Sequence, residues 1–187
     1  MPLRRGFKSE AHAIAREVRT ELGLRSADPL DPRALASHLE VPVHGISELR
    51  GTAPEAVRRF LTLDTAAFSA VTIFHGSART IWHNDAHSLG RQASNIAHEL
   101  AHALLLHEPG PVLSGDGARA WDSVAEEEAH WLGAALLVSD EAAFAVAASG
   151  GDLDAVARRY GVSRALLDFR LKVTGATLRV ARARRLS

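Results

Sequence analysis

The stretch NIAHELAHALLLHEPG, residues 95–110, determines how the rest of this sequence is interpreted. It contains two histidines four residues apart, His98 and His102, with Glu99 directly after the first. On an α-helix, residues four apart project from the same face, so both imidazoles can reach one ion. The pattern H-E-x-x-H is typical of a helix that binds zinc through its histidines and uses its glutamate as a general base. Composition alone predicts the pattern only roughly 0.03 times per chain of this length, so a metal site is the better explanation.

The aliphatic residues of the same stretch do not decide between a metal site and a plain amphipathic helix. Ala97, Leu100, Ala101, Leu104 and Leu105 can bury against a core whether or not the histidines bind an ion. Both interpretations predict a helix over about residues 89–107, ended by the Pro-Gly pair at 109–110. In the plain interpretation, the histidines and glutamate simply face water.

Composition limits the kinds of protein that this chain can be. Its 187 residues suit a single domain, and 47% hydrophobic with 24% charged residues is typical of a globular, soluble protein. The formal net charge is zero, which argues against general attraction to nucleic acid. Cysteine is absent, so a metal must be held by His, Asp or Glu. No signal peptide or membrane span is visible, and we expect a cytoplasmic protein.

Apolar periodicity and capping residues predict a mostly helical α+β domain with a small β-sheet. Its parts would be an N-terminal helical part (about 1–50), a catalytic core (about 55–140) and a helix-turn-helix-like C-terminal part (about 150–187). The predicted strands are residues 68–74 and 80–83, joined by a turn at 75–78. Besides the histidine helix, the predicted helices are 9–22 capped by Ser9, a short helix from Pro32 capped by Asp31, 122–138, 141–148 capped by Ser139 or Asp140, 153–160 capped by Asp152, and 164–174 capped by Ser163.

A catalytic zinc usually has three protein ligands, and the next long helix offers three consecutive glutamates. Glu126, Ala129 and Gly133 share one stripe at i, i+3 and i+7. Because the two small residues would let this helix pack closely on the histidine helix, we predict Glu126 as the third ligand. Glu127 lies about 100° further round and is expected in solvent. Glu128 is the alternative ligand.

Two longer segments carry a family resemblance. ARTIWHNDAHSLGRQASNIAHELAHALLLHEP, followed by AEEEAHWLGAALLVS, resembles the ImmA/IrrE family of metallo-endopeptidases. The matching motifs are H-E-L-x-H at 98–102 and E-x-x-A at Glu126 and Ala129. Leu132 and Gly133 replace the usual Phe-Ala, and His130 stands where Asn or Asp is common. None of these departures removes a ligand.

The resemblance implies a zincin-like metallopeptidase fold with a zinc ion. It implies His98, His102 and Glu126 as ligands and Glu99 as the general base. It also implies protease activity on a protein, with a transcriptional repressor as the typical target. The developing oxyanion of such a reaction needs a further donor, for which His130 and Tyr160 are the two candidates.

The remaining histidines are assigned other roles. His107 is predicted to point away from the metal and to interact with the negative end of the helix dipole. His75, His83 and His87 flank the predicted strands, where solvated or hydrogen-bonded surface roles are favoured over lining a substrate cleft.

The C-terminal segment supports a competing interpretation. DAVARRYGVSRALLDFRLK resembles half of a helix-turn-helix DNA reader, and an arginine-rich tail follows it. Leu167 and Leu171 form a core-facing stripe, which favours a helical hairpin that completes the peptidase domain. Arg170 stands where a DNA reader often has an aliphatic residue. The alternative function is therefore a DNA-binding or repressor-binding regulator, built on a zincin-like body without catalytic turnover.

Overall fold

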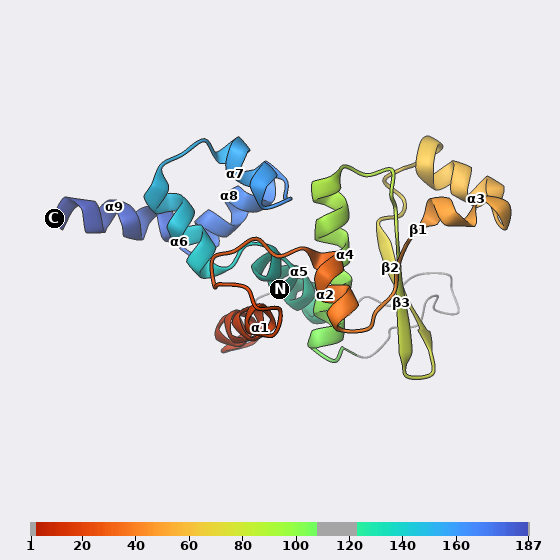
Figure 1. Ribbon diagram of the computed structural model, residues 1–187, viewed down its shortest axis with the longest axis horizontal. Helices are drawn as coiled ribbons and strands as arrows, with labels where there is room; N and C mark the ends of the chain where they lie inside the picture. Colours follow the sequence, from red (N-terminus) through yellow and green to blue (C-terminus); the bar gives the residue numbers. More distant parts are fainter. Residues whose placement is uncertain (1–2, 108–122, 187) are drawn as a thin grey trace.

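A computed structural model describes residues 3–107 and 123–186, in which a small sheet lies against one side of a group of helices (Figure 1). The α+β, mostly helical class is confirmed. The helices are α1 (Phe7–Glu21), α2 (Pro32–His38), α3 (Pro54–Arg58), α4 (Leu89–Leu104), α5 (Ser123–Leu137), α6 (Asp140–Ser149), α7 (Leu153–Arg159), α8 (Arg164–Val173) and α9 (Ala176–Leu186). The strands are β1 (Val43–Gly45), β2 (Ala70–His75) and β3 (Ala78–His83), and a 3-10 helix (Ile46–Gly51) and a π-helical turn (Arg59–Leu63) flank α3.

The sheet has the strand order β1-β3-β2, so β2 is an edge strand. Strands β2 and β3 pair antiparallel, as predicted, through a tight turn whose Gly76 has a φ of 61° that suits glycine. Strand β1 pairs parallel with β3. The sequence pattern does not anticipate β1, because three residues are too few to show an alternation.

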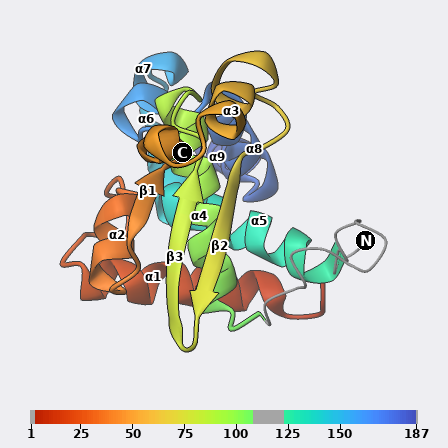
Figure 2. The same ribbon diagram turned by 90° about the vertical axis from the view of Figure 1, so that its right-hand side faces the viewer.

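Helix α4 runs between the sheet and α5 (Figure 1), and Figure 2 looks onto the sheet with α4 behind it. The helix is therefore covered on two sides, by β2 and β3 on one and by α5 on the other. Helices α1 and α2 contribute to the same hydrophobic core. The fully buried residues of α4 and α5 in this core are Ile96, Leu100, Ala101, Ala129, Leu132, Ala135 and Leu136.

Two buried arginines hold the C-terminal end of α5. Arg19 of α1 donates to the Leu136 carbonyl at 2.8 Å, and Arg170 of α8 donates to the Val138 carbonyl at 2.8 Å. The last carbonyls of a helix lack partners within the helix, and these side chains supply the missing donors. Each arginine is only 1% exposed, and burial lowers the pKa of Arg19 to about 10.

Helix α6 follows α5 after a short break. In the described part of the chain no single helix is long and apolar enough to cross a bilayer; α5 and α6 pass that test only as a pair, bent by 52°.

Side-chain caps confirm several of the predicted helix starts. Asp31, Ser139, Asp152 and Ser163 each accept a hydrogen bond from a backbone N–H of the first turn. Of the two candidates before α6, Ser139 is the cap.

The predicted start of α1 is wrong by two residues, because the helix begins at Phe7 after Gly6. The φ of Gly6 is 86°, so a glycine in the left-handed region turns the chain into the helix, and the Ser9 side chain does not cap it. The last segment also differs from the expectation of a tail, since residues 176–186 form the helix α9.

Helix α4 ends at Leu104, before the predicted end at His107. Leu106 has a φ of 53°, in the left-handed region, and this turn stops the helix. The predicted stop signal at Pro109 and Gly110, and the predicted helix start at Asp122, lie outside the described residues.

Candidate metal centre and active site

Three of the predicted site residues converge in space. His98 and His102 lie one turn apart on α4, and Glu126 reaches them from α5. The Nε2 atoms of the two histidines are 3.1 Å apart. Glu126 places Oε2 3.2 Å from Nε2 of His98 and Oε1 3.6 Å from Nε2 of His102. The three residues thus offer two imidazole nitrogens and a carboxylate oxygen within 4.8 Å of one another.

The close approach of α5 to α4 depends on Gly133. A Cβ at this position would lie 3.1 Å from the backbone nitrogen of His98 and 3.2 Å from the carbonyl carbon of Ala97. Ala129, one turn earlier on the same stripe, is fully buried. The small-residue stripe predicted on this helix therefore lies at the α4–α5 contact, where it brings Glu126 within reach of the histidines.

The charge of Glu126 matches the two imidazoles that it faces. The neighbouring imidazoles of His102 and His98 hold the pKa of the Glu126 carboxyl far below its usual range. The side chains of His98, His102 and Glu126 are 27%, 23% and 34% exposed, so the cluster is open to solvent on one side. A His-His-Glu donor set with one open side fits a catalytic zinc, which keeps a coordination position for water or substrate.

Glu99 points from α4 toward the sheet. The Thr72 hydroxyl on β2 donates to Oε2 of Glu99 at 2.6 Å. This short contact to a carboxylate is charge-assisted and fixes the orientation of the Glu99 side chain. The residue proposed as general base is thus held by an edge strand next to the histidine helix.

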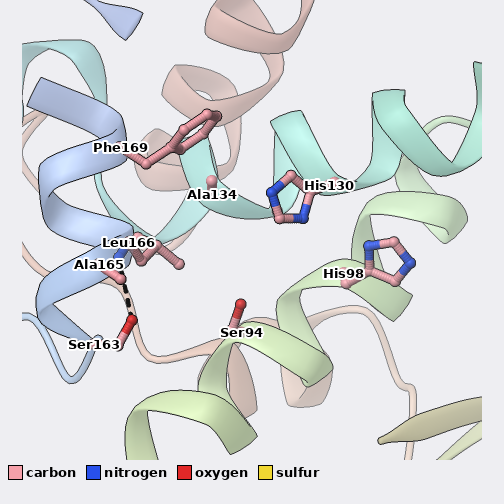
Figure 3. A pocket seen from close by; sticks show the side chains of 9 residues that line it. Ser94, His98, His130, Ala134, Ser163, Ala165, Leu166 and Phe169 are labelled. Atoms are coloured by element: carbon pink, nitrogen blue, oxygen red, sulfur yellow. Dashed lines mark hydrogen bonds between the residues drawn. The ribbon is translucent and has the colours of Figure 1, made fainter. Parts of the chain in front are cut away.

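A pocket of about 320 Å³ opens beside His98, between α4, α5 and α8 (Figure 3). Its wall combines apolar side chains with the rings of two histidines, His98 and His130. The ring of His130 lies 5.8 Å from that of Phe169. Partial burial and the nearby charge of His98 lower the pKa of His130. The other lining residues are Ser94, Gly133, Ala134, Ser163, Ala165, Leu166 and Phe169.

The structure does not bring Tyr160 to the site. The tyrosine is buried in the hydrophobic cluster of α6, α7 and α8, and its hydroxyl donates to the Ala27 carbonyl at 2.7 Å. Its proposed role as an oxyanion donor is therefore wrong, because the hydroxyl already has a backbone acceptor. Only His130, of the two candidates, borders the cluster.

The structure also decides the alternative ligand Glu128 and the position of His107. Glu128 is 4% exposed and faces His107, so it lies outside the cluster and is not the third member. His107 lies outside the cluster, as predicted, but its ring turns back onto α4, where its Nδ1 lies 2.9 Å from Nδ1 of His102. The turn at Leu106, which the sequence does not signal, folds His107 back onto the helix.

The histidines beside the strands have structural partners. Nε2 of His83 is 2.8 Å from the guanidinium of Arg33, and Nε2 of His87 is 2.8 Å from the Thr65 carbonyl. His75 is exposed at the end of β2. His83 and His87 are hydrogen-bonded as predicted, but the predicted surface position is wrong, because both side chains are buried.

Comparison with known proteins identifies the family. Residues 54–172, well over half of the chain, match the family model described as IrrE N-terminal-like domain, Peptidase_M78. The chain belongs to this family. The family is one of metallopeptidases, and the matched residues include the whole His98, His102 and Glu126 cluster. No curated protein matches the chain at a significant level.

Sequence reasoning missed Thr72 and the pocket around His130. Thr72 occupies one position of a predicted strand, and no local pattern shows which helix it will face. The pocket joins residues from three helices that are up to 75 positions apart in the chain, from Ser94 to Phe169. Both features depend on how the elements pack, so no signal in the sequence alone would have revealed them.

Proposed function

We propose that this protein is a zinc-dependent endopeptidase that cleaves a protein substrate. The observation that carries the proposal is the convergence of His98, His102 and Glu126 on one open site, with Glu99 one residue from the first histidine. Bound zinc would supply a Lewis acid for the scissile carbonyl and would lower the pKa of water toward 7. Nothing in this donor set requires another cofactor.

The residues of the site would have separate roles in the reaction. His98, His102 and Glu126 would hold the ion, and Glu99 would accept a proton from water and pass it to the leaving amine. The Thr72 hydroxyl keeps the Glu99 carboxylate in one orientation, so the base is positioned before the substrate arrives. His130, which borders the same site, is the remaining candidate for a donor to the oxyanion.

Two surfaces next to the cluster suit a peptide. Strand β2 is an edge of the sheet and carries Thr72, so an extended chain could pair with its backbone beside Glu99. The pocket beside His98 has a wall of small and apolar side chains, with Leu166 and Phe169 from α8. One substrate side chain could enter this pocket while the scissile bond lies at the metal site.

We take the substrate class from the family resemblance: a transcriptional repressor, with cleavage in the cytoplasm where such a repressor acts. No residue of the described structure selects this class. The proposal of peptide cleavage stands without it.

The alternative, DNA binding by the C-terminal part, has weaker support. A DNA-reading helix contacts base edges with its N-terminal residues. Here the start of α8 packs on α4, since a Cβ at Gly90 would lie 2.8 Å from the nitrogen of Ser163. Arg170, in the middle of α8, is buried against the end of α5. Loss of sequence-specific DNA binding on deleting the residues after Gly175 would favour the alternative.

The test combines metal content with cleavage. Protein purified without chelators should contain about one zinc per chain by elemental analysis. It should also cleave members of a peptide library analysed by mass spectrometry, and a chelator should abolish that cleavage.

A charge-removing variant then separates binding from chemistry. Glu99→Gln should keep zinc and the fold and lose roughly 10²- to 10⁴-fold in cleavage rate, the usual contribution of a general base. Glu127→Gln, the same change outside the cluster, is the control. Wild-type protein that takes up no metal even from added zinc, or a fully active Glu99→Gln variant, would contradict the proposal.

A further inference from the structure

A chain of polar contacts extends from the metal cluster into the protein. His102 turns its Nε2 toward His98 and Glu126, and its Nδ1 lies 2.9 Å from Nδ1 of His107. Nε2 of His107 lies 3.6 Å from Oε2 of Glu128, and Oε1 of Glu128 lies 2.7 Å from Nε of Arg4. The contacts thus run from the N-terminal segment, through α5 and the end of α4, to a residue of the cluster.

The backbone at the end of α4 is shaped to place His107 in this chain. The His107 N–H donates to the His102 carbonyl at 3.1 Å, and the Leu106 N–H donates to the Ala103 carbonyl at 3.2 Å. This is the Schellman pattern, which normally has glycine in its left-handed position. Here the position holds Leu106, with a φ of 53° that non-glycine residues rarely adopt and a side chain that is 80% exposed. Burial of the Leu106 side chain therefore does not explain the unusual turn. The structural consequence of the turn is that His107 folds back against His102.

One assignment of the ring protons gives each contact between His102, His107 and Glu128 a donor and an acceptor. When Nε2 of His102 directs its lone pair at a cation, the proton of the neutral ring is on Nδ1, which then donates to Nδ1 of His107. His107 in that state carries its own proton on Nε2, the atom that faces the Glu128 carboxylate. Each donor therefore faces an acceptor, and the arrangement favours the metal-binding tautomer of His102.

The burial of Glu128 also needs an explanation. Its side chain is only 6% exposed, and a buried carboxylate is costly unless it has partners. Arg4 supplies an opposite charge on one oxygen, while the other faces His107. The carboxylate thus lies between Arg4 and His107, and it contacts the nitrogen of His107 that does not face His102.

We propose that His107 and Glu128 are positioning residues that orient His102 and favour its metal-binding tautomer. The inference rests on the proposed function, because it assumes that His102 binds the ion. Neither residue contacts the ion or the substrate in this arrangement. Their effect should therefore appear in metal affinity, whether or not a substrate is present.

The test measures the zinc dissociation constant by competition with a chromophoric chelator. His107→Phe keeps a ring of similar size and removes both nitrogens, so zinc binding should weaken about 10- to 100-fold, the usual effect of losing such a partner. Glu128→Gln keeps the shape and removes the charge, and should weaken binding by a smaller factor. His107→Asn retains a polar atom near the Nδ1 position and should recover part of the affinity lost in His107→Phe.

Two variants serve as controls. His38→Ala removes a histidine from another His–Glu contact, the exposed pair with Glu21, and should leave zinc affinity unchanged. Leu106→Gly keeps the left-handed turn and should also bind zinc like the wild type. Circular dichroism should confirm that each variant compared is folded.

The outcomes separate the two proposals. Wild-type affinity in both folded His107→Phe and folded Glu128→Gln would overturn the positioning role while leaving the metal site intact. Equal losses in His107→Phe and His107→Asn would overturn it too, because the retained polar atom would then have no effect. A wild-type protein that binds no zinc would instead contradict the proposed function itself.

Discussion

At the scale of single residues, the three consecutive glutamates of α5 show how helical geometry separates identical side chains. Successive residues are about 100° apart, so Glu126 and Glu128 leave the helix on different sides. Glu126 faces the two histidines of α4, whereas Glu128 is buried against His107 and Arg4. The same residue type therefore has two different environments two positions apart.

The first prediction concerns the choice among these glutamates. Glu126→Ala removes a carboxylate that lies 3.2 Å from His98, and zinc affinity should fall more than in any other single glutamate variant of this run. Glu127→Ala should leave zinc affinity close to wild type, because this residue is not part of the cluster. Isothermal titration with zinc measures both. Loss of binding in Glu127→Ala together with retention in Glu126→Ala would show that the helix register is wrong.

A second residue-scale prediction concerns pH and His83. Burial, and then the charge of Arg33, lower the pKa of His83 from the ordinary value of 6.5. The unfolded chain therefore binds a proton at a higher pH than the folded protein does, and the free energy of unfolding should fall as pH decreases from 6.5 toward the folded pKa. In His83→Gln this part of the fall should disappear. Urea unfolding at several pH values gives the slope of the free energy of unfolding against pH for both proteins. Identical slopes in the wild type and His83→Gln would refute the lowered pKa of His83.

At the scale of elements, glycines set how closely the helices approach. Gly133 lets α5 lie against the backbone of His98, and Gly90 lets the start of α4 lie against the turn before α8. A glycine inside a helix destabilises it by about 1 kcal/mol relative to alanine. The close contacts between the helices offset this loss. The buried ends of Arg19 and Arg170 then fix the far end of α5. The cluster of His98, His102 and Glu126 is consequently built on two helices that are held close together.

The prediction at this scale is that Gly133→Val separates α4 from α5. The new Cβ would lie 3.1 Å from a backbone atom, which cannot move aside as a side chain could. Overpacking of this kind costs about 1–3 kcal/mol in the free energy of unfolding. Zinc affinity should fall as well, because Glu126 moves with α5.

Gly151→Val is the matched control for this change. Gly151 is exposed between α6 and α7, and the nearest atom to a new Cβ would be 3.9 Å away. Its effect should stay within about 0.5 kcal/mol. Chemical denaturation measures both variants, and equal stability would contradict the close-packing argument.

At the scale of the whole molecule, segments far apart in the sequence are tied together around α4 and α5. The loop after α1 contacts two later segments, because Ser139 donates to the Ser26 carbonyl and Tyr160 donates to the Ala27 carbonyl. Arg4 contacts Glu128 of α5. These long-range contacts connect the start of the chain to the helix that carries Glu126, so the cluster and the global fold should be stabilised together.

The prediction at this scale concerns metal removal. An ion that binds only the folded protein stabilises it by about 2.7 kcal/mol at 100 times its dissociation constant. For a chain of this length that corresponds to a rise in Tm of roughly 5–10 °C. Calorimetry with zinc and with a chelator should show this difference in the wild type, and His98→Ala should show none. A wild-type Tm that does not respond to zinc would count against the site.

Much of the fold and the core of the candidate site could be predicted because they depend on local rules. The i, i+4 spacing places His98 and His102 on one face of a helix, and the caps Asp31, Ser139, Asp152 and Ser163 start the helices that follow them. The stripe of Glu126, Ala129 and Gly133 is equally local, and its small side chains indicate which face of α5 can pack closely. These features require only the conformation of neighbouring residues, which the sequence by itself determined.

Other features were decided only by the tertiary structure, because they depend on residues distant in the chain or on conformations that the local sequence disfavours. The pairing of β1 with β3 and the contact of Thr72 with Glu99 arise from packing across tens of residues. The return of His107 to His102 requires a leucine in the left-handed region, which local propensity argues against. The sequence left Tyr160 open as an oxyanion donor, but in the fold its hydroxyl donates to the Ala27 carbonyl. Local preferences are a small part of the free energy at such positions, and long-range packing and hydrogen bonding outweigh them.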